Sequence, residues 1–455
     1  MKAQKPTLPK GTRDFGPEVM AKRNFILNTI KAVYQKFGFL PLETPSMENL
    51  SVLTGKYGDE GDQLLFKVLN SGQYLNTKSH QVTQEDVTKG EKHLTPIIAE
   101  KGLRYDLTVP FARFVVMNQN DIAFPFKRFQ IQPVWRADRP QRGRYREFYQ
   151  CDADVIGTDS LLCEAEIILM INEVLAKLQI TQFDIKINNR KILSGIAEYL
   201  GAQDDESDLF VAIDKLDKIG VDGVLKELNE KDFEASAIEK LRPILSPEGS
   251  LLEKINQAKV LLIDSTIGQQ GINELEEVFE LVQNYGLEET NIDFDITLAR
   301  GLSYYTGAIF EVKVKNVSIG SISGGGRYDN LTGMFGLPDM SGIGFSFGVD
   351  RVYDVMEELE LFPADTNIST EVMIVNFDKD SEKHAIGILS QLRDEEIKAE
   401  IYPSAAKMKK QMAYADKKNI PYVLLIGTDE IAAEKYTLKN MHSGEQQSVA
   451  VNEII

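Results

Sequence analysis

The sequence predicts an α+β body followed by a smaller α/β domain. Residues 127–135 and 146–156 are typical of two strands that flank an Arg- and Pro-rich turn, which makes a long hairpin. Strand character returns only after residue 290, beyond a long helical stretch. After residue 370, short apolar runs alternate with helical patterns, as parallel strands and crossover helices do.

The first element is an amphipathic helix over 17–37, with Gly38 as a natural stop. Its apolar residues at helical spacing are Phe25, Ile26, Ile30, Val33, Tyr34 and Phe37. FLPLETP is then expected to be extended and to end at Pro45. A buried helix is expected at about 160–177, and NIDFDITLAR and IFEVKVKNV predict two later strands. In the last domain EVMIVNF, AEIYP and PYVLLIG are the expected strands.

Composition divides the chain into domains. Residues 191–290 are mostly helical, Glu-rich and carry a net charge of −13, so we interpret them as an inserted domain. Residues 1–190 and 291–360 then form one discontinuous domain. LFPADTNIST at 361–370 is the expected linker, and 371–455 the final domain.

Composition also excludes several classes of protein. With 43 % hydrophobic and 26 % charged residues, a chain of 455 residues is globular and has more than one domain. No run approaches the ~18 apolar residues of a membrane span, and the N-terminal residues lack the apolar region of a secretory signal. Cys151 and Cys163 predict neither a disulfide scaffold nor a zinc site. We therefore expect a cytoplasmic protein with no membrane partner.

The net charge of −18 argues against a nucleic-acid partner, but its distribution does not. Residues 127–146 carry a net charge of +6, and residues 407–418 carry +4. Because the local field decides binding, two basic patches on an acidic protein are compatible with a polyanion. A solvated charged face is the simpler interpretation of the 407–418 lysines.

Common site chemistries are missing from the sequence. The four histidines, His80, His93, His384 and His442, are scattered and have no partner at metal-ligand spacing. There is no Gly-x-Ser-x-Gly elbow and no Gly-Lys-Ser/Thr phosphate loop. Neither a triad hydrolase nor a P-loop enzyme is supported.

Four segments are dense in rigid, polar or glycine residues. They are LRYDLTVP (103–110), the hairpin 126–157, LARGLSYYTG with SISGGGRYDNLTG (298–333), and SGIGFSFGVDRV (341–352). In this order the segments resemble the motifs of class II aminoacyl-tRNA synthetases, and the third resembles the signature of histidyl-tRNA synthetases. The similarity covers almost the whole chain.

The resemblance implies a six-stranded antiparallel catalytic sheet with flanking helices, a helical insertion domain and a C-terminal α/β anticodon-binding domain. It also implies a homodimer, whose interface would involve the helix at 17–37 and the strand that ends at Pro45. The implied reaction joins histidine to tRNA(His) in two steps, with ATP as a substrate and Mg²⁺ as a cofactor. The residues that bind the metal are not identified.

The implied chemistry needs fixed cations, because a carboxylate must approach the α-phosphate of ATP. Guanidinium suits this role, since it bonds phosphate oxygens bidentately and never deprotonates. By similarity Arg136 and Arg300 bind the α-phosphate from two sides and also contact the substrate, and Arg351 reaches the γ-phosphate. Phe148 is expected to stack on adenine opposite Arg351, with Asp138 near the exocyclic amine.

Selection of histidine requires polar groups that match one donor and one acceptor nitrogen of a neutral imidazole. The resemblance implies that Asp154 accepts from one ring nitrogen, that Tyr305 donates to the other, and that Tyr304 forms a wall. Other residues are expected to bind the α-amino group: Asp106, Thr108 and Gln150, with Leu107 through its backbone. Glycines 324–326 and Gly344 are expected to let the backbone approach the ligand.

The tRNA would lie along the basic turn of the hairpin. Arg139, Gln141 and Arg142 are the candidate contacts to its acceptor stem, and Lys409 and Lys410 are candidates for phosphate contacts in the final domain.

Two alternatives stay open at this point. One is an inert regulatory paralogue that keeps the fold, and the other is a class II ligase for another amino acid.

Overall fold

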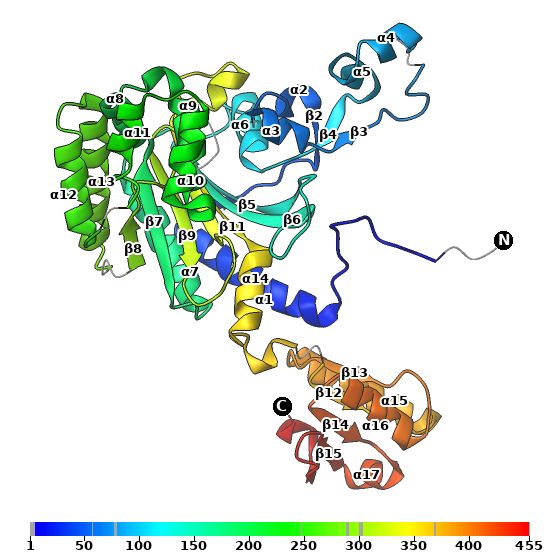
Figure 1. Ribbon diagram of the computed structural model, residues 1–455. Coiled ribbons are helices and arrows are strands. Elements are labelled where there is room, and N and C mark those ends of the chain that lie inside the picture. Colours follow the sequence, from blue (N-terminus) through cyan, green and yellow to red (C-terminus); the bar gives the residue numbers. More distant parts are fainter. Residues whose placement is uncertain are drawn as a thin grey trace. The chain divides into compact units, whose positions relative to one another are not determined.

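The computed structural model describes most of the chain and divides it into two compact units, residues 1–362 and 363–455. The described residues are 5–56, 58–76, 80–246, 248–287, 291–299, 304–367 and 370–454. Figure 1 shows the elements of both units. No helix among the described residues is long and apolar enough to cross a membrane.

The main sheet of the first unit has eight strands in the order β1-β5-β6-β11-β10-β9-β7-β8. Six of them form the continuous antiparallel part: β5 (Phe126–Trp135), β6 (Glu147–Ile156), β11 (Gly342–Gly348), β10 (Ser323–Tyr328), β9 (Ala308–Val314) and β7 (Phe183–Asn189). β1 (Leu40–Pro41) and β8 (Ile292–Phe294) add one short parallel strand to each edge. The expected number of six is therefore corrected to eight.

The two added strands have a simple physical reason. Each edge of a six-stranded sheet leaves a row of unpaired backbone groups, and a short passing segment can pair with it. The segment 291–300 contributes only three residues of strand, shorter than its sequence predicted. Pro41 is tolerated because β1 is an edge strand.

Three helices pack close to the central strands of this sheet. α1 (Pro17–Lys36) matches the predicted first helix and buries its apolar face against the strands β5 and β6 and the helices α7 (Leu162–Lys177) and α14 (Val349–Glu358). The Tyr34 hydroxyl on α1 donates to the carbonyl of Cys151 on β6 at 2.7 Å. Helix periodicity therefore identified a helix that supports the strand carrying much of the site.

The acidic helical segment contains α8 (Arg190–Leu200), α9 (Glu206–Ile213), α10 (Leu216–Glu230), α11 (Ala235–Leu241), α12 (Leu251–Leu261) and α13 (Thr266–Asn284). Its apolar residues belong to the same buried cluster as those of the main sheet. α8 and α13 approach closely, because a Cβ on Gly195 would lie 2.7 Å from the Cα of Gly268. The boundaries at 190 and 291 of an inserted domain stay a prediction.

A second sheet of three short strands precedes the hairpin and was not predicted. It comprises β2 (Met47–Asn49), β4 (Lys101–Leu103) and β3 (Lys67–Val68). The helices around it are α2 (Leu50–Leu53), α3 (Gly58–Gln63), α4 (Gln84–Thr88), α5 (Glu91–Ile98) and α6 (Thr108–Met117). α6 begins within the motif LRYDLTVP, so this sheet and helix fix the position of residues 105–108.

The second unit has a five-stranded sheet in the order β13-β12-β14-β15-β16. Its elements are β12 (Val372–Ile374), α15 (Lys379–Asp394), β13 (Ala399–Ile401), α16 (Met408–Lys417), β14 (Tyr422–Leu425), α17 (Thr428–Ala433), β15 (Tyr436–Asn440) and β16 (Gln446–Val449). β12, β13 and β14 are parallel, as expected, but β15 and β16 form an antiparallel hairpin that the sequence interpretation missed. Short 3₁₀ helices occur at Gln203–Asp205, Thr332–Phe335, Ala364–Asn367 and Val451–Glu453.

Candidate active site

One cavity of about 250 Å³ brings together most of the residues that the sequence motifs single out. Ten predicted site residues other than glycine line it: Asp106, Thr108, Arg136, Asp138, Phe148, Gln150, Asp154, Tyr304, Tyr305 and Arg351. They come from the β5–β6 hairpin, the start of α6, the segment before β9, and the start of α14. Leu107 is fully buried beside the cavity rather than in its lining, and Arg300 lies outside the described residues.

Alternation along β6 gives the cavity an acidic wall. Gln150, Asp152 and Asp154 are spaced two residues apart, so their side chains share one face of the strand. All three line the cavity, and both aspartates are buried. Asp106 adds a third buried carboxylate, whose Oδ1 accepts from the Val109 backbone at 3.2 Å near the start of α6.

Asp154 is held by partners from two other strands. Its Oδ1 accepts from the Tyr328 hydroxyl at 2.7 Å, and its Oδ2 lies 2.8 Å from Arg128 Nη2, an ion pair without the alignment of a hydrogen bond. Burial raises the pKa of Asp154, while Arg128 and the Tyr328 hydrogen bond oppose that rise. Oδ2 thus keeps the capacity to accept a hydrogen bond from a ligand.

The sequence interpretation missed Arg128 and Tyr328. Arg128 is fully buried and sits directly opposite Asp154 in the β5–β6 pairing, so strand register was the signal that could have found it. Arg128 also donates to the carbonyl of Leu107 at 3.4 Å, which engages the backbone group expected near the ligand. Tyr328 follows the triple glycine on β10 and had no signal of its own in one sequence.

Two of the glycines make room for site side chains, and Gly324, Gly325 and Gly344 line the cavity. Their expected contact with the ligand stays a prediction. A Cβ on Gly344 would lie 2.0 Å from Asp154 Oδ1, and a Cβ on Gly326 would lie 2.8 Å from the Tyr305 ring. Real Cβ atoms do not approach other heavy atoms so closely. Glycine at these positions therefore lets Asp154 and Tyr305 occupy the wall of the cavity.

A pair of tyrosines also lines the cavity. The ring centroids of Tyr304 and Tyr305 are 5.0 Å apart, and Tyr304 packs edge-on to Tyr328 at 6.3 Å. Burial raises the pKa of Tyr304 well above its usual value, with smaller contributions from Tyr305 and Asp106. The Tyr304 phenol therefore stays protonated at neutral pH and can donate a hydrogen bond.

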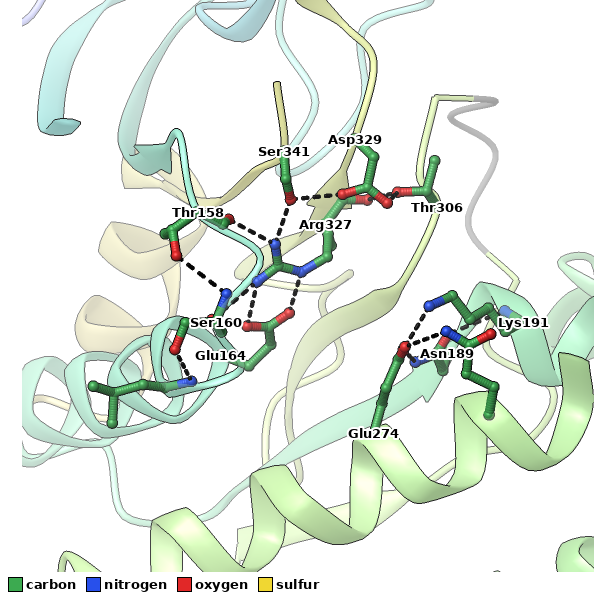
Figure 2. A network of polar contacts seen from close by, with 12 residues as sticks. Thr158, Ser160, Glu164, Asn189, Lys191, Glu274, Thr306, Arg327, Asp329 and Ser341 are labelled. Atoms are coloured by element: carbon green, nitrogen blue, oxygen red, sulfur yellow. Dashed lines mark hydrogen bonds and ion pairs between the residues drawn. The ribbon is translucent and has the colours of Figure 1, made fainter. Parts of the chain in front are cut away.

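The segment that carries these tyrosines is anchored at Thr306 by a buried polar network (Figure 2). The Thr306 hydroxyl donates to Asp329 at 2.7 Å, and Asp329 also accepts from Ser341 at 2.7 Å. Arg327 donates to Ser341 at 2.6 Å and to both oxygens of Glu164 on α7 at 2.5 and 2.7 Å. The network joins this segment to β10 and α7.

The part of the signature before Arg300 is anchored as well. The buried Asn188 amide on β7 donates to the carbonyls of Ile296 and Leu298, both at 3.0 Å. Arg190 donates to the carbonyl of Ala299 at 3.3 Å. Beside them, Glu274 of α13 binds Asn189 and Lys191 in the second part of Figure 2.

Arg136 brings a positive charge to the cavity lining. Its Nε donates to the carbonyl of Tyr105 at 3.1 Å, and its guanidinium carbon lies 4.2 Å from the Tyr105 ring centroid and 5.2 Å from that of Phe148. These contacts hold the guanidinium beside the predicted adenine platform. Asp138 lines the same cavity and lies 3.6 Å from Arg144, which ends the basic turn expected to follow the acceptor stem.

Arg351 ties the hairpin to the start of α14. Its Nε donates to the carbonyl of Gly143 at 2.9 Å and its Nη1 to the carbonyl of Ser321 at 2.6 Å. These two contacts fix the guanidinium at the edge of the cavity that it lines, and guanidinium groups bind phosphate oxygens well.

None of the candidate tRNA contacts belongs to the cavity lining. Arg139, Gln141 and Arg142 are exposed on the turn between β5 and β6, and Arg142 makes an ion pair with Glu358. Lys409 and Lys410 are exposed on α16 of the second unit.

The residues of the cavity do not form a metal centre of the protein's own. Across the described ranges, no group of three or more His, Cys, Asp or Glu side chains is arranged to hold a metal ion.

The six antiparallel strands, the hairpin with its arginines and the arginine that opens α14 define a class II aminoacyl-tRNA synthetase. Comparisons with known proteins identify the family within this class. The family model of histidyl-tRNA synthetase matches residues 99–352, and that of the anticodon-binding domain matches residues 371–455. The chain belongs to the histidyl-tRNA synthetase family.

Individual relatives match this chain over almost their full length. The chain is 59 % identical to a histidine–tRNA ligase of Cytophaga hutchinsonii over 99 % of both chains. It is 56 % identical to one of Bacteroides fragilis, over 100 % of this chain and 99 % of that protein. Among solved structures, the histidyl-tRNA synthetase of Nostoc sp. PCC 7120 is similar, with a TM-score of 0.83, 31 % identity and 99 % coverage of both chains.

Proposed function

We propose that this protein ligates L-histidine to tRNA(His) through a histidyl-adenylate intermediate. The observation that carries the proposal is that buried carboxylates, two tyrosines, Arg136 and Arg351 line one cavity. Full-length relatives at 50–59 % identity named histidine–tRNA ligase support it. They also disfavour an inert paralogue or a ligase for another amino acid.

The first step joins histidine to AMP. A carboxylate oxygen of histidine attacks the α-phosphorus of ATP, the bond from that phosphorus to the bridging oxygen breaks, and pyrophosphate leaves. Arg136 would hold the α-phosphate and the carboxylate, Arg351 the γ-phosphate, and Arg300 the α-phosphate from the other side. Fixed cations stabilise the charge that spreads over the phosphoryl oxygens, without acid–base catalysis.

Selection would occur at the acidic wall. Asp154 Oδ2 would accept from one imidazole nitrogen, and Tyr305 would donate to the other. Phe148 and Asp138 would take adenine, while Asp106, Thr108 and Gln150 would bind the α-amino group. An analogue without ring nitrogens leaves buried partners unpaired, which can reduce kcat/KM by ~10⁴–10⁵.

The second step transfers the histidyl group to tRNA. A hydroxyl of the terminal ribose attacks the adenylate carbonyl, AMP leaves with the electron pair of the broken bond, and the hydroxyl proton passes to the phosphate of the departing AMP. Arg139, Gln141 and Arg142 would contact the acceptor stem, and Lys409 and Lys410 phosphates near the anticodon. Mg²⁺ would enter with ATP, bound to its phosphates as part of the substrate.

The proposal includes a homodimer that acts in the cytoplasm. Apolar side chains are exposed on β1 and on β2, Leu40 at 59 % and Met47 at 51 %, and a second copy could cover them. Both cysteines are free and buried, which suits a reducing compartment. The proposed domains are catalytic (1–190 with 291–360), insertion (191–290) and anticodon-binding (371–455), with a linker at 361–370.

ATP–pyrophosphate exchange with each of the twenty amino acids tests the function. We expect exchange with histidine alone. Exchange with none would favour the inert paralogue, and exchange with a different amino acid alone would overturn the proposed substrate. Addition of tRNA(His) should then release AMP.

A further inference from the structure

We propose that Asp152 is a further specificity-determining residue, which binds the α-ammonium group of the amino-acid substrate. The proposal rests on the function proposed above and deepens it. Asp152 lies on β6 between Gln150 and Asp154, is 2 % exposed and lines the cavity. The sequence motifs gave it no role.

Two buried hydrogen-bond acceptors on the acidic wall have no hydrogen-bond partner among the described residues. Asp152 Oδ1 and Gln150 Oε1 are both buried and have no hydrogen-bond partner among the described residues. The Gln150 amide nitrogen donates to the Ser346 hydroxyl at 3.3 Å, so its oxygen is the end left to accept. Because buried acceptors without partners are costly, two of them on one wall of a cavity point to a ligand with several N–H donors.

The acidic wall carries more negative charge than Arg128 can pair with closely. Arg128 is the cation beside this wall, and its Nη2 lies 2.8 Å from Asp154 but 3.9 Å from Asp152. One guanidinium therefore faces two buried carboxylates, and it pairs closely with only one of them. The surplus negative charge at Asp152 matches a cation that the substrate brings. The ammonium group of an amino acid has that charge and three N–H donors.

The spacing of Asp152 and Asp154 along β6 matches the distance between the ring and the ammonium group of histidine. Alternate residues of a strand are about 7 Å apart, so Asp152 lies one step from Asp154, the proposed partner of the ring. In histidine a single methylene separates the ring from the Cα that bears the ammonium group. A ligand whose ring reaches Asp154 Oδ2 can therefore bring its ammonium group to Asp152 and Gln150.

The protonation of Asp152 gives the proposal a second readout. Burial raises its pKa to about 7, with Arg128 opposing and Asp154 adding to the rise. An ammonium group at this carboxylate would lower the pKa again, so binding near pH 7 should release a proton. The titratable and charged groups around Asp152 are Arg104, Arg128, Asp106, Asp154, Cys151, Tyr34, Tyr304 and Tyr328.

The test is calorimetric titration of the full chain and of Asp152→Asn with two probes. The probes are L-histidine and imidazolepropionic acid, which is histidine without its amino group. At pH 8 we expect Asp152→Asn to weaken histidine binding by about tenfold to a hundredfold, the value of a charged hydrogen bond, and to leave the deamino probe unchanged. The matched control, Asp154→Asn, should weaken both probes.

Each other outcome overturns the proposal. Unchanged histidine binding by Asp152→Asn would remove Asp152 from the ligand contacts, and equal weakening of both probes would assign it to the ring or to the fold. If the wild-type chain binds no histidine, the proposed function fails as well. At pH 7, wild-type titrations in two buffers of different ionisation enthalpy should show proton release, whether or not the variant folds. Absence of proton release would contradict the proposal.

Discussion

Asp152 and Asp154 have the same side chain on the same strand face, and their neighbours make them different. Asp154 has a hydroxyl from Tyr328 and a close guanidinium from Arg128, while Asp152 has the Ser346 hydroxyl and shares that guanidinium only at 3.9 Å. Alternation along β6 predicted that such residues share a face. Their partners include Arg128 on the paired strand β5 and Tyr328 on β10. A single sequence does not show that these residues meet β6.

The raised pKa of Asp152 predicts a pH-dependent gain in stability for Asp152→Asn. Its pKa rises from 3.8 to about 7 on folding, so the folded chain holds a proton that the unfolded chain has lost between these values. In this window wild-type stability falls as pH rises. Because asparagine does not titrate, the advantage of the variant should grow from pH 4 to pH 7 and reach at most about 4 kcal/mol above it.

Urea unfolding of both proteins at pH 4.5, 6 and 8 measures this advantage. An advantage that stays constant over this range would show that Asp152 ionises in the folded chain as easily as in the unfolded one.

Among the elements, the β5–β6 hairpin and α1 follow from local pattern, and the structure gives them within one residue of the prediction at the strand ends. The sheet of β2, β3 and β4 does not, because its strands are only two or three residues long and pair across the sequence. The network around Arg327 could not be predicted from the local sequence pattern either. It joins residues from α7 and β10 that are 163 positions apart.

The Arg327–Glu164 pair should be essential to the position of the tyrosine segment. Neither side chain is exposed by more than 6 %, so removal of one partner leaves a buried charge. We expect Arg327→Ala to lower the free energy of unfolding by about 3–5 kcal/mol. The double variant Arg327→Met/Glu164→Leu should be more stable than either single change.

The exposed pair Arg142–Glu358 offers a matched control for chemical unfolding. Its side chains are 56 % and 40 % exposed, so Arg142→Ala should leave the unfolding midpoint nearly unchanged. Equal effects at the two pairs would contradict a structural role for the buried network.

At the scale of the whole molecule, the distribution of charge predicts more than its sum. The net charge of −18 suggested no polyanion, whereas the family models match a synthetase and an anticodon-binding domain. Composition marked the change near residue 361, and the structure divides its units at 362. It did not show that the acidic helices share a core with the main sheet, because shared burial depends on packing between distant segments.

Lys409 and Lys410 should contribute to tRNA binding without affecting amino-acid activation. We expect the double change to alanine in the full chain to leave histidine-dependent exchange unchanged and to raise the KM for tRNA(His). The slope of log binding against log salt should fall by up to about two, one for each lost phosphate contact. Lys218→Ala/Lys226→Ala, which removes the same charge from α10, is the control, and an equal effect there would indicate a general field rather than a contact.

The central claim is that one cavity holds the histidine ring at its acidic wall and the ATP phosphates at its arginines. A crystal structure of the protein with histidine and a non-hydrolysable ATP analogue tests it most directly. We expect one ring nitrogen within hydrogen-bond distance of Asp154, the other near the Tyr305 hydroxyl, and the phosphates beside Arg136 and Arg351. A ring bound away from both Asp154 and Tyr305 would contradict the account.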